Sequence, residues 1–267
     1  MGLIKNYQRS LIDRVKENKA TFIIFTILRV LIVVVMIRSI FIGNYEGVFT
    51  CILTLLLLLI PSFLKGALRI SIPPLFESII YLFIFSANIL GELAHFYAHI
   101  PIWDTMLHTL NGFLFAAVGY SAVDLLNRSS KKIKLSPLYL TLVAFCVSMT
   151  IGVLWEFFEC GMDLFFGTDM QKDFIVTHIY SAEMNSEGQV PFVIENIVQT
   201  VITTADGATY IVEGYLDIGL LDTMKDLFVD FAGAFLFCTF GYFYAGHSDK
   251  GRIARQFIPR VEEDGDA

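Results

Sequence analysis

The sequence predicts an all-α integral membrane protein, a bundle of six transmembrane helices, and three observations support this prediction. First, 55% of the residues are hydrophobic and only 17% are charged, whereas a soluble domain carries about 25% charged residues. Second, the apolar residues form long blocks, as membrane-spanning helices require. Third, the basic residues gather between alternate blocks, a pattern typical of oriented membrane proteins.

Six apolar segments are long enough to cross a bilayer, which takes about 20 helical residues. We expect them at 20–42, 48–64, 74–97, 104–126, 137–166 and 220–245. Pro74 and Pro137 begin the third and fifth segments, because proline suits the first helical position, where its missing N–H would be unpaired anyway. The expected organisation is a cytoplasmic segment 1–19, a membrane domain 20–246 and a cytoplasmic, disordered tail 247–267 that is acidic after Arg260.

The loops between these spans differ in charge. Fifteen of the nineteen lysines and arginines lie in the N-terminal segment, the second and fourth loops, and the tail. Because cytoplasmic loops carry an excess of Lys and Arg, both termini are expected to be cytoplasmic. Residues 168–219 then form a long outer loop, and Asp206-Gly207 between two β-rich runs predicts a β-hairpin over 198–216. The alternative is a solvated connector.

Composition and motifs exclude several classes of function. The isoelectric point near 5.2 and the absence of a basic patch exclude nucleic acid as a partner. The four cysteines all lie in apolar segments, so we interpret them as small core residues rather than disulfides or metal ligands. The sequence contains no Gly-x-Ser-x-Gly, His-Glu-x-x-His or phosphate-loop motif. The lipid bilayer is the partner that this composition predicts.

Acidic and histidine side chains recur every three or four residues at the outer ends of four predicted spans, so each set lies on one helix face. Charge in a membrane is costly, which makes these residues candidates for function. The expected metal ligands are Glu92, His95, His108, Glu156, Glu159, Asp226 and Asp230. The expected catalytic groups are Glu92, His108, Glu156 and Asp226. Asp104, Asp163 and Asp222 have two interpretations, as site residues or as ordinary helix-end residues.

The chemistry of these residues leaves two ways to balance their charge. Many carboxylates cannot all stay ionised in a low dielectric, so either they share protons or a metal cation supplies positive charge. Oxygen and imidazole ligands suit a divalent Mg, Mn, Fe or Zn ion. Glu92-x-x-His95 matches an element of di-iron bundles, but that pattern needs two such elements and the chain has one. Arg29 and Asp230 fall at similar depths, so an ion pair between them is one interpretation and a cavity lined by Arg29 is another.

Three sequence blocks resemble a known family. The blocks are Trp103-Asp104-Thr105 with His108 and Gly112, the Leu-Trp-Glu-Phe-Phe-Glu run at 154–159, and Asp222-Thr223-Met224-Lys225-Asp226 with Gly233. They resemble the uncharacterised bacterial multi-pass membrane family typified by the inner-membrane protein YjdF, and more distantly VanZ-type glycopeptide-resistance membrane proteins. The resemblance implies a bacterial plasma-membrane protein and carries no assigned reaction. The long 168–219 segment departs from the short-loop version of the family.

Three functions follow as hypotheses. The first is a membrane-embedded enzyme that acts from outside on a lipid or envelope precursor and depends on a metal or on carboxylates. The second is a proton- or cation-coupled transporter with the carboxylates as its coupling site. The third is a non-catalytic accessory protein whose polar cluster only holds the helices together. In the cytoplasmic half of the spans, Glu77 and Asp124 lie near the helix ends, and few polar residues lie between them and the outer cluster. This disfavours a path through the membrane, which a transporter needs.

Overall fold

The computed structural model describes residues 18–63, 70–129, 134–185, 188, 190–246 and 256–261. Within these residues, six helices are long and apolar enough to cross a membrane, which confirms the predicted number of spans. The candidate spans are Lys19–Phe41, Tyr45–Phe63, Pro74–Leu93, Trp103–Asn127, Pro137–Phe166 and Leu220–Phe243. The chain divides into two compact units, residues 152–228 and the residues on either side of them.

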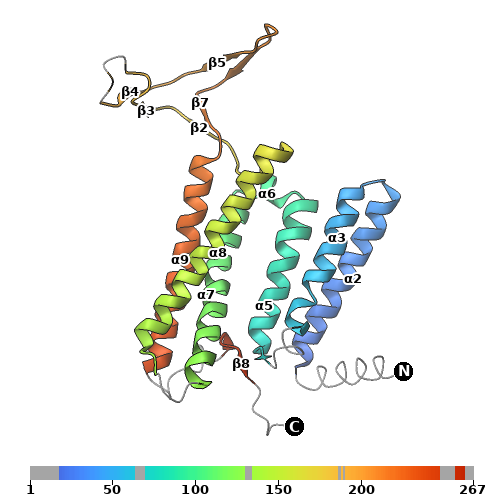
Figure 1. Ribbon diagram of the computed structural model, residues 1–267. Coiled ribbons are helices and arrows are strands. Elements are labelled where there is room, and N and C mark those ends of the chain that lie inside the picture. The colour runs from blue at the N-terminus through green and yellow to red at the C-terminus, as the bar shows by residue number, and fades with distance from the viewer. Residues whose placement is uncertain are drawn as a thin grey trace. The chain divides into compact units, whose positions relative to one another are not determined.

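The first two spans form a helical hairpin of α2 (Lys19–Phe41) and α3 (Tyr45–Leu57) that packs against α5 (Pro74–Phe85) (Figure 1). Asn44 ends the tight connection, because its side-chain oxygen accepts a hydrogen bond of 2.9 Å from the amide of Gly47 and caps α3. Apolar side chains from all three helices meet, among them Ile32, Cys51 and Tyr81, all fully or almost fully buried. Close packing of these side chains holds the three membrane helices together.

The third span is not the continuous helix that the sequence predicts. After α5 the chain forms the π-helix η1 (Ser86–Leu93), and the short helix α6 (Phe96–His99) follows. His95 separates them with φ of 58°, a left-handed conformation that non-glycine residues rarely adopt. The amide of Ala94 donates to the carbonyl of Ile89 at 3.0 Å, the five-residue spacing of a π-turn. Residues 92–95 therefore lose the regular spacing on which the expected Glu92-x-x-His95 pairing depends.

Helix α7 (Trp103–Ser129) lies directly against the second half of α9 (Leu220–Gly246). A Cβ atom at Gly112 would overlap the carbonyl oxygen of Asp230, and one at Gly233 would overlap the carbonyl oxygen of Thr109. The two glycines thus allow backbone-to-backbone approach, as small residues do between membrane helices. The first half of α8 (Pro137–Phe166) joins them, since the hydroxyl of Ser148 donates to the carbonyl of Gly112 at 2.7 Å.

The C-terminal segment is ordered where the sequence analysis expects disorder. Strand β8 (Arg260–Val261) pairs antiparallel with β1 (Ile70–Ser71). Ile258 is fully buried in the apolar core, and the ring of Phe257 lies 5.3 Å from that of Phe113. Ordering this segment costs conformational entropy, and burial of these two apolar side chains offsets that cost. A tail with only polar side chains would gain no such burial and would remain disordered. Residues 247–255 and 262–267 of the expected tail lie outside the described residues.

Six short strands lie between α8 and α9 and form three antiparallel pairs. The strands are β2 (Phe174–Val176), β3 (Ile179–Ser181), β4 (Phe192–Ile194), β5 (Thr200–Thr203), β6 (Thr209–Val212) and β7 (Tyr215–Asp217). Strand β2 pairs with β7, β3 with β4, and β5 with β6 across Asp206-Gly207. The expected second run, 208–216, is not one strand. Gly214, with φ of 111°, interrupts it and redirects β7 toward β2.

Candidate polar site on helices α7 and α9

Helix α7 carries three polar side chains on one face near its start. Asp104, His108 and Asn111 follow one another at spacings of four and three residues, which places them one helical turn apart. Asp104 and His108 are both buried. Their closest charged atoms, Oδ1 of Asp104 and Nε2 of His108, are 3.7 Å apart. The face therefore brings a carboxylate, an imidazole and an amide into one buried stretch.

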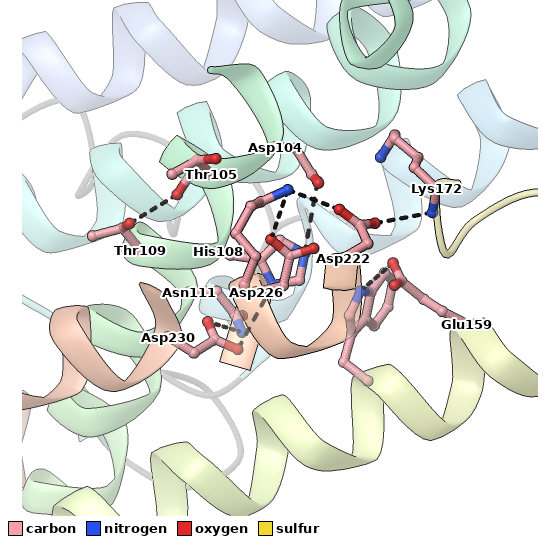
Figure 2. Close-up of polar contacts among 12 residues, drawn as sticks. Asp104, Thr105, His108, Thr109, Asn111, Glu159, Lys172, Asp222, Asp226 and Asp230 are labelled. Carbon is pink, nitrogen blue, oxygen red and sulfur yellow. Dashed lines mark hydrogen bonds and ion pairs between the residues drawn. The ribbon is translucent and has the colours of Figure 1, made fainter. Parts of the chain in front are cut away.

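Asp230 of α9 completes this group. Nδ1 of His108 lies 3.7 Å from its Oδ2, and the side-chain amide of Asn111 donates to its Oδ1 at 3.3 Å. Figure 2 shows His108 and Asn111 reaching toward Asp230 from one helix. The close approach at Gly112 supports this geometry, because Gly112 contacts the backbone of Asp230 itself. Asp230 therefore contacts His108 rather than Arg29, whose guanidinium lies 5.2 Å from the ring centre of Phe25.

The charge of Asp230 is only partly compensated by these contacts. The residue is 1% exposed, and its Oδ2 has no hydrogen-bond partner among the residues that the structure describes. A separation of 3.7 Å from His108 exceeds the length of a hydrogen bond. Burying an ionised carboxylate without full pairing is costly. Asp230 is therefore a candidate ligand for a cation.

The first turns of α9 contain a second set of charges. Nζ of Lys225 lies 2.7 Å from Oδ1 of Asp222 and 3.5 Å from Oδ1 of Asp226. The backbone amide of Lys172 donates to Oδ2 of Asp222 at 3.0 Å. Both aspartates are 1% exposed, so Asp222 is a buried, paired residue and not an ordinary solvated helix end. Asp226 precedes Asp230 by one turn of the same helix.

The acidic residues of α8 divide into two kinds. Glu156 and Glu159 are buried, and Glu159 accepts a hydrogen bond of 2.8 Å from the indole of Trp155. Asp163 instead organises the chain after the helix, because its carboxylate accepts hydrogen bonds from the amides of Met170 and Gln171, at 2.7 and 2.8 Å. The helix-end interpretation therefore describes Asp163 well. Glu156 and Glu159 remain candidates for the site.

Glu92 and His95 lie in the irregular part of the third span. Glu92 is exposed near the end of η1, and His95 is exposed at the break that follows. The backbone carbonyl of His95 lies 2.8 Å from Nδ1 of His99. The sequence predicted that Glu92 and His95 lie on one face of a regular helix. The π-helix and the left-handed conformation of His95 interrupt that helix, so the two residues do not share such a face.

A comparison with protein families identifies the chain. Residues 23–247 match the family described as predicted membrane protein DUF2238. The chain belongs to this family. A DUF2238 protein with six apolar helices is a multi-pass membrane protein, and the lipid bilayer is its environment. Neither the comparison with curated proteins nor that with solved structures finds a match.

The donor atoms of this DUF2238 protein fit a metal ion. Asp104, His108 and Asp230 bring two carboxylates and one imidazole together in one buried group. Carboxylate oxygen and imidazole nitrogen together suit Mg, Mn, Fe or Zn. Asn111 would fix the orientation of the Asp230 carboxylate through its hydrogen bond to Oδ1, as hydrogen-bonded partners of metal ligands commonly do.

Two residues of these polar groups were not among those expected from the sequence. Asn111 lies three residues after His108, and Lys225 lies three residues after Asp222. Both spacings put the residue on the face of its acidic or histidine neighbour, so helical periodicity is the signal that could have found them. Asn111 is uncharged and Lys225 is basic, so neither belongs to the acidic and histidine residues from which the site was predicted.

Proposed function

We propose that the protein binds a divalent cation inside the membrane and uses it to act on a lipid or envelope precursor. The observation that supports this proposal is the buried Oδ2 of Asp230, which has no hydrogen bond among the described residues and lies 3.7 Å from Nδ1 of His108. A cation beside these two atoms would supply the charge that the carboxylate lacks.

The separation of the two atoms suits such an ion. A metal about 2.1 Å from a nitrogen and an oxygen ligand spans 3.7 Å when the angle between them is roughly 120°. Asp104 would supply a further oxygen from α7, and Asp226 another from the turn of α9 before Asp230. We include Glu156 and Glu159 as further ligands or acid/base groups because both are buried carboxylates. We include Glu92 and His95, which are both exposed, on the basis of the sequence alone.

The chemistry follows from this set of donors. A divalent cation held by these residues would supply Lewis-acid chemistry toward a substrate oxygen or a bound water molecule. A carboxylate that is not fully committed to the ion, such as Glu156 or Asp226, would accept the proton released. His108, which lies between Asp104 and Asp230, would hold the two helices in register at the reacting atoms.

The location and orientation belong to the same proposal. The resemblance to the YjdF-typified and VanZ-type proteins supports a bacterial plasma membrane. The distribution of fifteen of nineteen basic residues supports cytoplasmic termini, with residues 168–219 outside. Asp104 and Asp222, at the starts of α7 and α9, would then face the outer side. The site would therefore lie toward the outer leaflet.

Metal content is the decisive measurement. We expect purified wild-type protein to retain a divalent cation by elemental analysis, and Asp230→Asn to lose it. Asp124→Asn is the matched control, because Asp124 is a buried aspartate further along α7. A well-folded wild type without stoichiometric metal would refute the cation proposal and favour proton coupling or a structural role.

Activity needs a separate measurement. Protein reconstituted in bacterial lipid extract should change the lipid profile, measured by mass spectrometry, only when the divalent cation is present. Asp230→Asn should show no such change, whereas Asp124→Asn should behave like wild type. Metal retention without any metal-dependent product would leave a binding or accessory protein and refute the enzymatic part of the proposal.

A further inference from the structure

The strands between α8 and α9 expose most of their side chains. Each of the three pairs has only two strands in the described part of the chain. An isolated two-stranded hairpin is marginally stable in water and usually needs a third strand or a packed face. The pair β5–β6 is the longest of the three, with four residues in each strand. It therefore offers the longest edge for hydrogen bonds with a third strand.

Both faces of the β5–β6 hairpin are apolar. Val201 lies opposite Ile211 on one face, and Ile202 lies opposite Tyr210 on the other. These four side chains are between 43% and 65% exposed. One exposed apolar residue is ordinary, but apolar pairs on both faces of one ribbon mark an interaction surface.

The backbone of the hairpin is also available. Neither β5 nor β6 pairs with a third strand among the described residues, so each has an outer edge of amide and carbonyl groups. An extended peptide can add to such an edge through main-chain hydrogen bonds, with alternate side chains contacting each face.

Charge decides which occupant fits. Residues 168–219 contain eight aspartates and glutamates and one lysine, Lys172. A second copy of this segment would meet the same negative charge, and an anionic lipid surface would repel it as well. Asp206 lies in the turn of the hairpin and Glu213 directly after β6. A hydrogen bond from the hydroxyl of Thr204 lowers the pKa of Asp206, and this carboxylate is charged at neutral pH as an ordinary aspartate is. The charge pattern thus favours a basic partner.

We propose that the β5–β6 hairpin binds a basic, extended segment of a partner protein as an added β-strand. The apolar residues of that segment would contact Val201 and Ile211, or Ile202 and Tyr210, and its lysines or arginines would pair with Asp206 and Glu213. This interaction is independent of the cation site. Its success or failure leaves the proposed function unchanged.

A peptide titration tests the proposal on the full-length protein in detergent. The probe is a fluorescent eight-residue peptide of alternating Lys and Val, and binding is measured by fluorescence anisotropy. We expect saturable binding that Ile211→Asp weakens at least tenfold. Val193→Asp on β4, 48% exposed in a different strand pair, should leave the affinity unchanged.

Further arms separate the proposed mode from simpler ones. Methylation of alternate peptide nitrogens should abolish binding, because it removes edge hydrogen bonds and keeps the charge. The double variant Asp206→Lys, Glu213→Lys should weaken binding even if Ile211→Asp disturbs the hairpin. Equal binding of a Glu-Val peptide, or of the methylated peptide, would overturn the proposal. A wild-type dimer in light scattering that Ile211→Asp dissociates would also overturn it, since the occupant would then be a second copy.

Discussion

His108 of α7 and Asp230 of α9 face each other across a contact that is buried and yet too long for a hydrogen bond, with 3.7 Å between Nδ1 and Oδ2. Asn111 binds the other oxygen of the same carboxylate. The arrangement holds a carboxylate in place while leaving one oxygen turned toward the imidazole. The proposed cation site is based on this geometry, which also determines which substitutions are informative.

Asn111→Ala should lower the affinity for a divalent cation by about 10- to 100-fold, the usual cost of losing a partner that orients a metal ligand. The physical reason is that Oδ1 of Asp230 would lose its amide donor and the carboxylate could rotate. Calorimetric titration of metal into apo-protein measures the effect. Thr109→Ala is the control, since the hydroxyl of Thr109 bonds the carbonyl of Thr105 in its own helix. Equal affinities in the two variants would contradict a positioning role.

Gly112→Ala and Gly233→Ala should each destabilise the protein by about 1–3 kcal/mol, the typical cost of forcing an extra carbon into a packed interface. Each new Cβ atom would meet a backbone carbonyl that cannot move without shifting a helix. Thermal unfolding in detergent gives the comparison. Gly161→Ala provides a matched control because a Cβ atom there would meet nothing within 4 Å. In α8 it should be neutral or slightly stabilising, since alanine favours helix. If all three variants unfold alike, the close contact of α7 and α9 is wrong.

Lys225→Met should destabilise the start of α9 by about 1–3 kcal/mol, because the buried Asp222 would lose a charged hydrogen bond. The effect is limited by the 35% exposure of the lysine side chain, which leaves its ammonium partly solvated. Lys225→Arg should retain most of the stability, since a guanidinium also donates to carboxylates. The measurement is the thermal unfolding midpoint of each variant and of wild type in the same detergent. A methionine variant as stable as wild type would show that this ion pair contributes nothing.

Asp173 should make the segment after α8 sensitive to pH. Partial burial raises the pKa of Asp173, and the nearby carboxylates of Asp169, Asp217 and Asp163 raise it further. A raised pKa in the folded state means that the protonated form is favoured there. The contribution to stability is therefore fully present below the ordinary aspartate pKa, about 3.9, and is lost as pH rises through the raised value.

Carboxyl NMR shifts measure this pKa directly, with Asp173→Asn for assignment. We expect Asp173 to titrate above the usual aspartate value and Asp206, whose pKa its hydrogen bond with Thr204 lowers, to titrate below it. The Asn variant should remove the corresponding loss of stability on raising the pH. Titration of Asp173 at or below the ordinary value would contradict the crowding of these four carboxylates.

The prediction of the spans succeeded where local chemistry decides. Helix α8 runs from Pro137 to Phe166, the same boundaries as the predicted segment, because proline begins it and a polar stretch follows it. The prediction was wrong for the end of the third span and for the tail at 256–261. The π-helix and the left-handed His95 depend on how the chain packs, and strand β8 depends on a distant partner at Ile70–Ser71.

The sequence by itself determined that this is a six-span membrane protein and that its acidic residues cluster near helix ends, because hydrophobic length and helical period are local properties. Only the tertiary structure decided that His108 meets Asp230 and that Asn111 belongs with them. Those contacts depend on the rotation of each helix about its axis and on the close approach at Gly112 and Gly233. Rotation and approach are set by packing between distant residues, which no single stretch of sequence contains.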